Sequence, residues 1–134
     1  MSEMYEINVE YSFTLTDEDI EDIIVTALEG GIGYWCCLDN TEKEFENAPD
    51  DEPISITASK ILLSGGKIFL IDEVENERYS MSLLDLLDGI KEWVSEGLDH
   101  YNAISTGGID CCNIDSACAD SIFQCALFGG IEYA

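Results

Sequence analysis

Residues 67–96 read KIFLIDEVENERYSMSLLDLLDGIKEWVSE, and this stretch indicates a fold that combines β-strands with α-helices. An apolar run at residues 67–72, a polar run and the alternating segment 78–82 form a pattern typical of a β-hairpin. Ser82 then predicts the N-cap of a helix over residues 83–96. The expected buried side of this helix consists of Leu83, Leu86, Leu87, Ile90, Trp93 and Val94.

Upstream, residues 5–15 alternate between apolar and polar side chains, which predicts a strand with one solvated face. Thr16 precedes three acids and predicts the N-cap of a helix that runs to about residue 29, where Gly30 and Gly31 end it. The expected buried face of this helix consists of Ile20, Ile23, Ile24, Ala27 and Leu28.

Three segments between these elements are less regular. Residues 32–38 are short and apolar, which fits a strand or a buried loop. Residues 39–52 are rich in acids and turn formers and predict an exposed loop with Phe45 as an apolar anchor. Residues 54–64 are compatible with a short helix or a strand, because they begin with an alternating pattern but continue with a helical one.

Downstream, Asn113 or Asp115 can cap a largely apolar helix over residues 116–128, and residues 131–133 can return as an edge strand. The order of elements predicts a single α+β domain over residues 1–134. We expect a mostly antiparallel sheet with three helices packed on one face.

Charge is the most informative bulk property, because 29 acidic residues face five basic ones and the formal net charge is -24. The acids are spread over both halves of the chain rather than gathered in a tail. Direct binding to nucleic acid is disfavoured, since phosphate contacts need clustered Lys and Arg. The negative electrostatic field of such a protein attracts the basic surfaces of other proteins.

No apolar stretch is long enough to span a membrane, and the N-terminal residues lack the features of a signal peptide, so we expect a cytoplasmic protein. Cysteines would normally be reduced in that compartment. The six cysteines are Cys36, Cys37, Cys111, Cys112, Cys118 and Cys125.

Catalytic and metal-binding patterns are weak throughout the chain. Adjacent cysteines in a strand point to opposite faces and chelate a metal poorly, whereas Cys118 and Cys125 share one face of a helix and suit a core. His100 is the single histidine, and the acidic loop at 39–52 does not match an EF-hand. We therefore expect no enzymatic activity, no metal and no cofactor.

The acids follow the helical period on the faces opposite the apolar ones. In the helix over 83–96 they form one stripe, and in the helix over 17–29 a second group lies on the outer face. Like charges one helical turn apart destabilise a helix, so such stripes suggest a compensating use, and a merely solvated acidic face is the alternative. The residues expected to bind a partner are Glu18, Asp22, Asp85, Asp88, Glu92 and Glu96.

The segments TALEGGIGYWC at 26–36, NID at 113–115 and ALFG at 126–129 resemble those of small acidic proteins encoded in prophages and mobile elements of Firmicutes. The resemblance spans most of the chain but carries no known catalytic motif. It implies a phage accessory protein, a class that includes anti-CRISPR and anti-restriction inhibitors that imitate DNA. No functional residue transfers from it.

Three functional hypotheses result. The first is an inhibitor that occupies the basic nucleic-acid-binding surface of a defence nuclease with its acidic face. The second is a structural or adaptor protein of the phage life cycle that assembles through an apolar patch around Tyr34, Trp35 and Phe45. The third is an enzyme or ligand-binding protein with a pocket near the glycines at 30–33 or 107–108. The oligomeric state stays open, with a homodimer among the alternatives.

Overall fold

A β-hairpin supplies two of the three strands of the main sheet in the computed structural model, which describes residues 4–5, 14–96, 104–105, 108–109 and 115–133. Strand β2 (Lys67–Asp72) pairs antiparallel with β3 (Glu77–Ser82). Asn76, at a φ of 57°, occupies a left-handed conformation in the turn that joins them. The hairpin predicted from the sequence is thus confirmed.

Strand β1 (Cys36–Asp39) pairs antiparallel with the other edge of β2, so that the sheet has the order β1-β2-β3. One face of this sheet carries Ile68, Leu70 and Met81, which are fully buried. The opposite face carries Arg78 and Ser80, which are exposed. A second, two-stranded sheet pairs β4 (Ile104–Ser105) with β5 (Gly108–Ile109).

Four α-helices accompany the sheets in the part of the chain that the structure describes, one more than the sequence predicts. They are α1 (Asp17–Thr26), α2 (Ile54–Leu63), α3 (Leu83–Ser95) and α4 (Ser116–Phe128). Helix α1 continues into a π-helical segment, η1 (Ala27–Gly31), and a short 3-10 helix, η2 (Lys43–Phe45), lies in the loop after β1. The overall α+β class agrees with the expectation.

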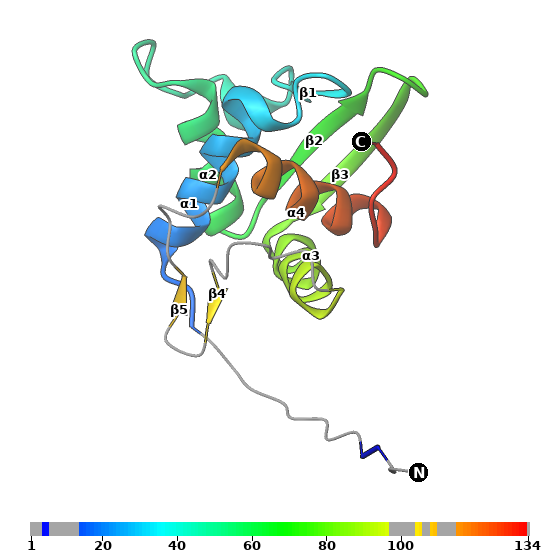
Figure 1. The fold of residues 1–134 in the computed structure, drawn as a ribbon. Helices are drawn as coiled ribbons and strands as arrows, with labels where there is room; N and C mark the ends of the chain where they lie inside the picture. Colours follow the sequence, from blue (N-terminus) through cyan, green and yellow to red (C-terminus); the bar gives the residue numbers. More distant parts are fainter. Residues whose placement is uncertain (1–3, 6–13, 97–103, 106–107, 110–114, 134) are drawn as a thin grey trace.

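Figure 1 shows how the helices surround the buried face of the sheet. Helices α1 and α2 lie side by side, and α4 runs between α1 and the hairpin, with α3 packed along it. Gly89 of α3 permits close packing there, because a Cβ at this position would come within 2.6 Å of the Cα of Ala126. Helix α4 is therefore the central helix, in contact with α1, α3 and β3.

Local capping explains the three helices that the sequence predicts. Thr16 and Ser82 each form a capping box with the acid three residues later, at the starts of α1 and α3. Asp115, rather than Asn113, caps α4 by accepting a hydrogen bond from the backbone of Cys118. Gly129 ends α4 in a left-handed conformation at a φ of 75°.

Residues 54–63 form helix α2, one of the two alternatives that the sequence leaves open, because Ala58, Ile61 and Leu62 share one helical face and are buried. Two expectations need correction. Residues 131–133 form no strand, since their backbone is bonded by a side chain of α4 instead. Leu87 is 39% exposed although its position predicts burial.

The strand predicted over residues 5–15 falls largely on residues 6–13, which lie outside the described residues. The segments around His100 and around Cys111 and Cys112 lie outside them as well. Among the described residues, the helices are too short or too polar to cross a membrane.

Candidate interaction surface

The acidic stripe of α3 is largely exposed, as its helical spacing predicts. Asp88 and Glu96 are exposed and Glu92 is half-buried, on the side away from Leu86, Ile90 and Trp93. The negative charge of this stripe also acts on α4. Burial raises the pKa of Cys125 to about 11, and the carboxylates of Glu92 and Glu96 add to that shift.

Asp85, the fourth predicted member of this stripe, has a local structural role. Its carboxylate accepts a 2.9 Å hydrogen bond from the backbone N–H of Ser82, while the Ser82 hydroxyl accepts one of 3.2 Å from the N–H of Asp85. This capping box begins α3 and leaves Asp85 half-buried. Asp85 is thus less available to a partner than Asp88 or Glu96.

The second acidic group lies on α1, where Glu18 is exposed and Asp22 is half-buried. Helices α1 and α3 both pack against α4. The six predicted residues therefore lie in the two groups that the sequence predicts, on two helices that flank a third.

Two of the five basic residues, Lys60 and Arg78, form ion pairs in the described part of the chain, and Lys91 lies on α3 itself without an ion pair there. In the part of the chain that the structure describes, Lys60 pairs with Glu52, and Arg78 pairs with Asp39 and Glu42. The guanidinium of Arg78 also lies 4.0 Å from the centre of the Phe69 ring. These ion pairs hold the loop after β1, so among the described residues no ion pair neutralises the acids of α1 and α3.

The apolar patch predicted around Tyr34, Trp35 and Phe45 does not form a continuous surface. Trp35 is 1% exposed, and Phe45 is half-buried against the core, so that only Tyr34 is exposed. The prediction that Trp35 lies in an exposed apolar patch was wrong, because its indole is buried and donates a hydrogen bond to a buried acceptor.

That acceptor is Asp120 of α4. The indole Nε1 of Trp35 donates a 2.8 Å hydrogen bond to Oδ1 of Asp120, and the hydroxyl of Tyr34 donates one of 2.6 Å to Oδ2. Burial and this carboxylate raise the pKa of Tyr34 to about 12. A buried carboxylate needs such partners, and these bonds hold the segment after η1 against α4.

Gln124, one turn after Asp120, extends the cluster to the C-terminal segment. Its Nε2 donates to Oδ1 of Asp120 and to the carbonyl of Tyr133, each at 3.0 Å. Its Oε1 accepts hydrogen bonds of 2.8 Å from the backbone N–H groups of Glu132 and Tyr133. The sequence did signal this cluster, since Asp120 and Gln124 interrupt an otherwise apolar helix at a spacing of four residues.

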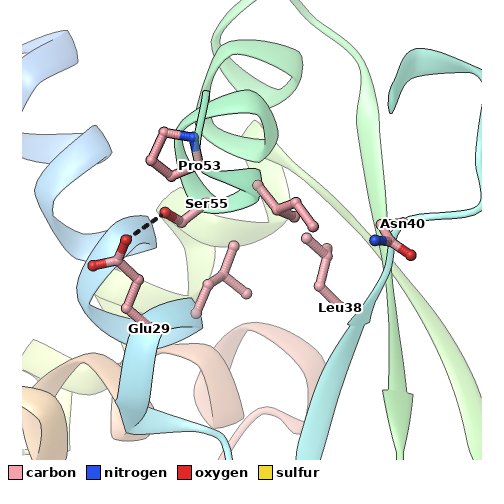
Figure 2. A pocket seen from close by; sticks show the side chains of 7 residues that line it. Glu29, Leu38, Asn40, Pro53 and Ser55 are labelled. Atoms are coloured by element: carbon pink, nitrogen blue, oxygen red, sulfur yellow. Dashed lines mark hydrogen bonds between the residues drawn. The ribbon is translucent and has the colours of Figure 1, made fainter. Parts of the chain in front are cut away.

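A hollow of about 300 Å³ lies where η1, the end of β1 and the start of α2 meet (Figure 2). Ser55 donates a 2.9 Å hydrogen bond to the carboxylate of Glu29 across it. Helix α2 has no side-chain N-cap of its own, and a carboxylate near the positive end of the helix dipole is favourable. The lining residues are Leu28, Glu29, Leu38, Asn40, Pro53, Ile54 and Ser55. This hollow lies close to the glycines at 30–33, where the sequence suggested a pocket. The carboxylate of Glu29 in it is explained by its hydrogen bond to Ser55 at the start of α2.

The described cysteines are mostly buried, and no group of metal ligands is found in the described part of the chain. Cys36, Cys118 and Cys125 are buried in the core, and burial raises the pKa of Cys36 to about 12. A thiol with such a pKa is a weak nucleophile at neutral pH. No three potential ligands converge on one point among the described residues.

Comparison of the chain with protein-family models, with curated proteins and with solved structures finds no match. The acidic faces of α1 and α3, with few cations to neutralise them, are therefore the features on which a functional proposal can rest.

Proposed function

We propose that this protein is a non-catalytic inhibitor that occupies the basic nucleic-acid-binding surface of another protein with the acidic faces of α3 and α1. A defence nuclease is the kind of partner that the resemblance to phage-encoded acidic proteins favours. The observation that carries the proposal is the placement of the ion pairs. The ion pairs of Lys60 and Arg78 involve Asp39, Glu42 and Glu52, whereas Glu18, Asp88 and Glu96 stay exposed and enter no ion pair among the described residues.

The spacing of the acids supports a surface that imitates nucleic acid. Asp88, Glu92 and Glu96 succeed one another every four residues, which separates them by about 6 Å along the helix axis. Carboxylates at this interval are spaced comparably to successive phosphates along a nucleic-acid backbone. Basic grooves built for DNA would attract such a row of charges.

The proposal is tested by capture of partners from expressing cells at about 0.1 M and about 1 M salt, where the Debye length falls from ~10 Å to ~3 Å. The informative variant is D88K/E92K/E96K, which leaves the capping residue Asp85 in place. We expect a partner that binds the wild type only at low salt, that is lost with the variant, and that duplex DNA displaces in a purified competition assay.

A matched control reverses three acids of the loop, E44K/E46K/D50K, and alters the net charge equally. If both variants lose the partner to the same extent, the acidic face of α3 is not the binding surface. A partner that persists at 1 M salt and is not displaced by DNA would contradict mimicry and favour the adaptor function.

A further inference from the structure

A second hollow, of about 430 Å³, lies between the end of the hairpin and the C-terminal residues. This hollow is distinct from the acidic faces of α1 and α3. It is lined by residues from the end of β2, the hairpin turn, β3, the end of α4 and the segment after α4. The lining residues are Asp72, Glu75, Tyr79, Phe128, Glu132 and Tyr133.

Three of these side chains are aromatic and lie at steep angles to one another. The rings of Tyr79 and Phe128 have centres 5.3 Å apart and an interplanar angle of 87°. The rings of Phe128 and Tyr133 have centres 6.1 Å apart and an angle of 70°. Rings set edge to face in this way are an ordinary packing of aromatic side chains, and rings that line an open hollow attract a cation through the face that the packing leaves uncovered.

The aromatic side chains that line this hollow are held in position by contacts with buried residues. Tyr133 stacks on Trp35 with ring centres 5.2 Å apart, and its hydroxyl donates a 2.6 Å hydrogen bond to Asp72. Asp72 is 1% exposed and also accepts hydrogen bonds from the backbone of Val74 and Glu75. A site organised before binding loses less entropy when a ligand enters it.

The other lining groups are acidic. Glu75 and Glu132 are exposed at the hollow, and Asp72 adds a buried carboxylate. Burial raises the pKa of Tyr79, and the carboxylates of Glu77, Asp72, Glu75 and Glu132 raise it further. No ion pair among the described residues involves Glu75 or Glu132.

We propose that this hollow binds one cationic side chain, Lys or Arg, of the basic partner. The aromatic rings contact the apolar stem and the face of the charged group, and the carboxylates of Glu75 and Glu132 accept its hydrogen bonds. The identity of the occupant as a partner side chain rests on the proposed function, whereas the affinity of the hollow for a cation does not.

The affinity is measured with the amides of N-acetyl-arginine, N-acetyl-lysine and N-acetyl-citrulline. Citrulline resembles arginine in shape but carries no charge. The readout is the NMR shift of the indole N–H of Trp35, which stacks on Tyr133. We expect saturable shifts with the two cations at millimolar concentration, and a Kd for citrulline at least about tenfold weaker.

Two variants locate the site. Tyr79→Leu removes one aromatic wall and should weaken binding of both cations by about threefold to tenfold. E75Q/E132Q keeps the hollow intact and should weaken it to a similar extent. The matched control D88N/E92Q neutralises two acids on α3 and should alter the Kd by less than about twofold, because the pair lies outside this hollow.

Absence of saturable binding, or equal losses in E75Q/E132Q and in D88N/E92Q, would overturn the proposal. Either outcome would leave the proposed binding of a partner by the acidic face of α3 unaffected. The two proposals fail separately: a partner that is lost with D88K/E92K/E96K but captured normally with E75Q/E132Q upholds the acidic face and overturns the hollow as a partner contact.

Discussion

The indole N–H of Trp35 donates a 2.8 Å hydrogen bond to the buried carboxylate of Asp120, across 85 residues of sequence. This bond joins the segment between η1 and β1 to the central helix α4. The same carboxylate accepts hydrogen bonds from Tyr34 and Gln124, so one acidic side chain satisfies three donors. The stability of the domain should therefore depend strongly on Asp120.

Asp120→Ala should lower the free energy of unfolding by about 3 kcal/mol, because it leaves buried donors without an acceptor. Asp120→Asn should cost less, since its amide retains one oxygen. Urea unfolding followed by tryptophan fluorescence measures both. Glu44→Gln removes one charge from an exposed position and serves as the control, with an expected change within about 0.5 kcal/mol. Equal effects of Asp120→Ala and Glu44→Gln would contradict the structural role of Asp120.

Gly31 and Gly30 provide a matched pair for the contact between η1 and α4. A Cβ at Gly31 would lie 2.7 Å from the carbonyl oxygen of Ser116, whereas a Cβ at Gly30 would have its nearest neighbour at 3.9 Å. Gly31→Ala should therefore destabilise the protein by about 1–3 kcal/mol through overpacking. Gly30→Ala should be neutral or slightly stabilising, because alanine favours helical backbone. Thermal unfolding of the two variants decides the point, and equal melting temperatures would disprove the close packing.

Much of the fold was predictable because its signals are local. Thr16 and Ser82 mark helix starts within four residues. An apolar run before the hairpin turn and an alternating segment after it indicate the two strands. Helix α2 was ambiguous because Ser55 and Thr57 give its first turn the alternation of a strand, although burial follows the helical period.

The C-terminal segment and the site were less predictable because they depend on distant contacts. Residues 131–133 contain strand-forming residues, but the amide of Gln124 binds the backbone of Glu132 and Tyr133. Helical spacing correctly placed Asp88 and Glu96 at the surface, whereas it could not show that Trp35 would be buried against Asp120. The aromatic hollow joins β3 to Tyr133, and no single motif in the sequence marks it.

Tyr133→Phe should make the protein less stable at neutral pH and alter its acid unfolding. Burial alone would raise the pKa of Asp72, but hydrogen bonds from Tyr133 and from the backbone of Glu75 and Val74 outweigh it and hold that pKa below its usual value. A carboxylate with a lowered folded pKa stabilises the fold above its unfolded pKa of about 3.9, and this contribution disappears as the pH falls through the folded value.

The stability difference between wild type and Tyr133→Phe should thus be constant above about pH 5 and shrink below about pH 4. Urea unfolding at pH 7, 5 and 3.5 measures it. Ser80→Ala, which removes a hydroxyl at an exposed position of β3, is the control and should show no such dependence. A difference that grows on acidification would contradict the bond to Asp72.

Salt should stabilise this protein, which is the opposite of what a protein held by surface ion pairs would show. With a net charge of -24, screening reduces self-repulsion in the folded state. The melting temperature should rise between about 0.02 and 0.5 M NaCl, and the rise should be smaller in D88N/E92Q/E96Q. A melting temperature that falls with salt would mean that the few ion pairs dominate.

Substitutions of Asp85 and Asp88, two acids of α3, should affect stability and partner binding differently. Asp85→Ala removes half of the capping box and an acid from the first turn of α3, and should cost about 1 kcal/mol. Asp88→Ala removes an exposed acid four residues before Glu92 and should leave stability unchanged or raise it by a few tenths of a kcal/mol.

Partner binding should follow the reverse order, with the larger loss for Asp88→Ala because its carboxylate is free to contact a basic surface. Calorimetric unfolding and the DNA competition assay on the same two variants measure both orders. If Asp85→Ala weakened binding more than Asp88→Ala without lowering stability, the assignment of Asp85 to the helix cap and of Asp88 to the partner surface would be reversed.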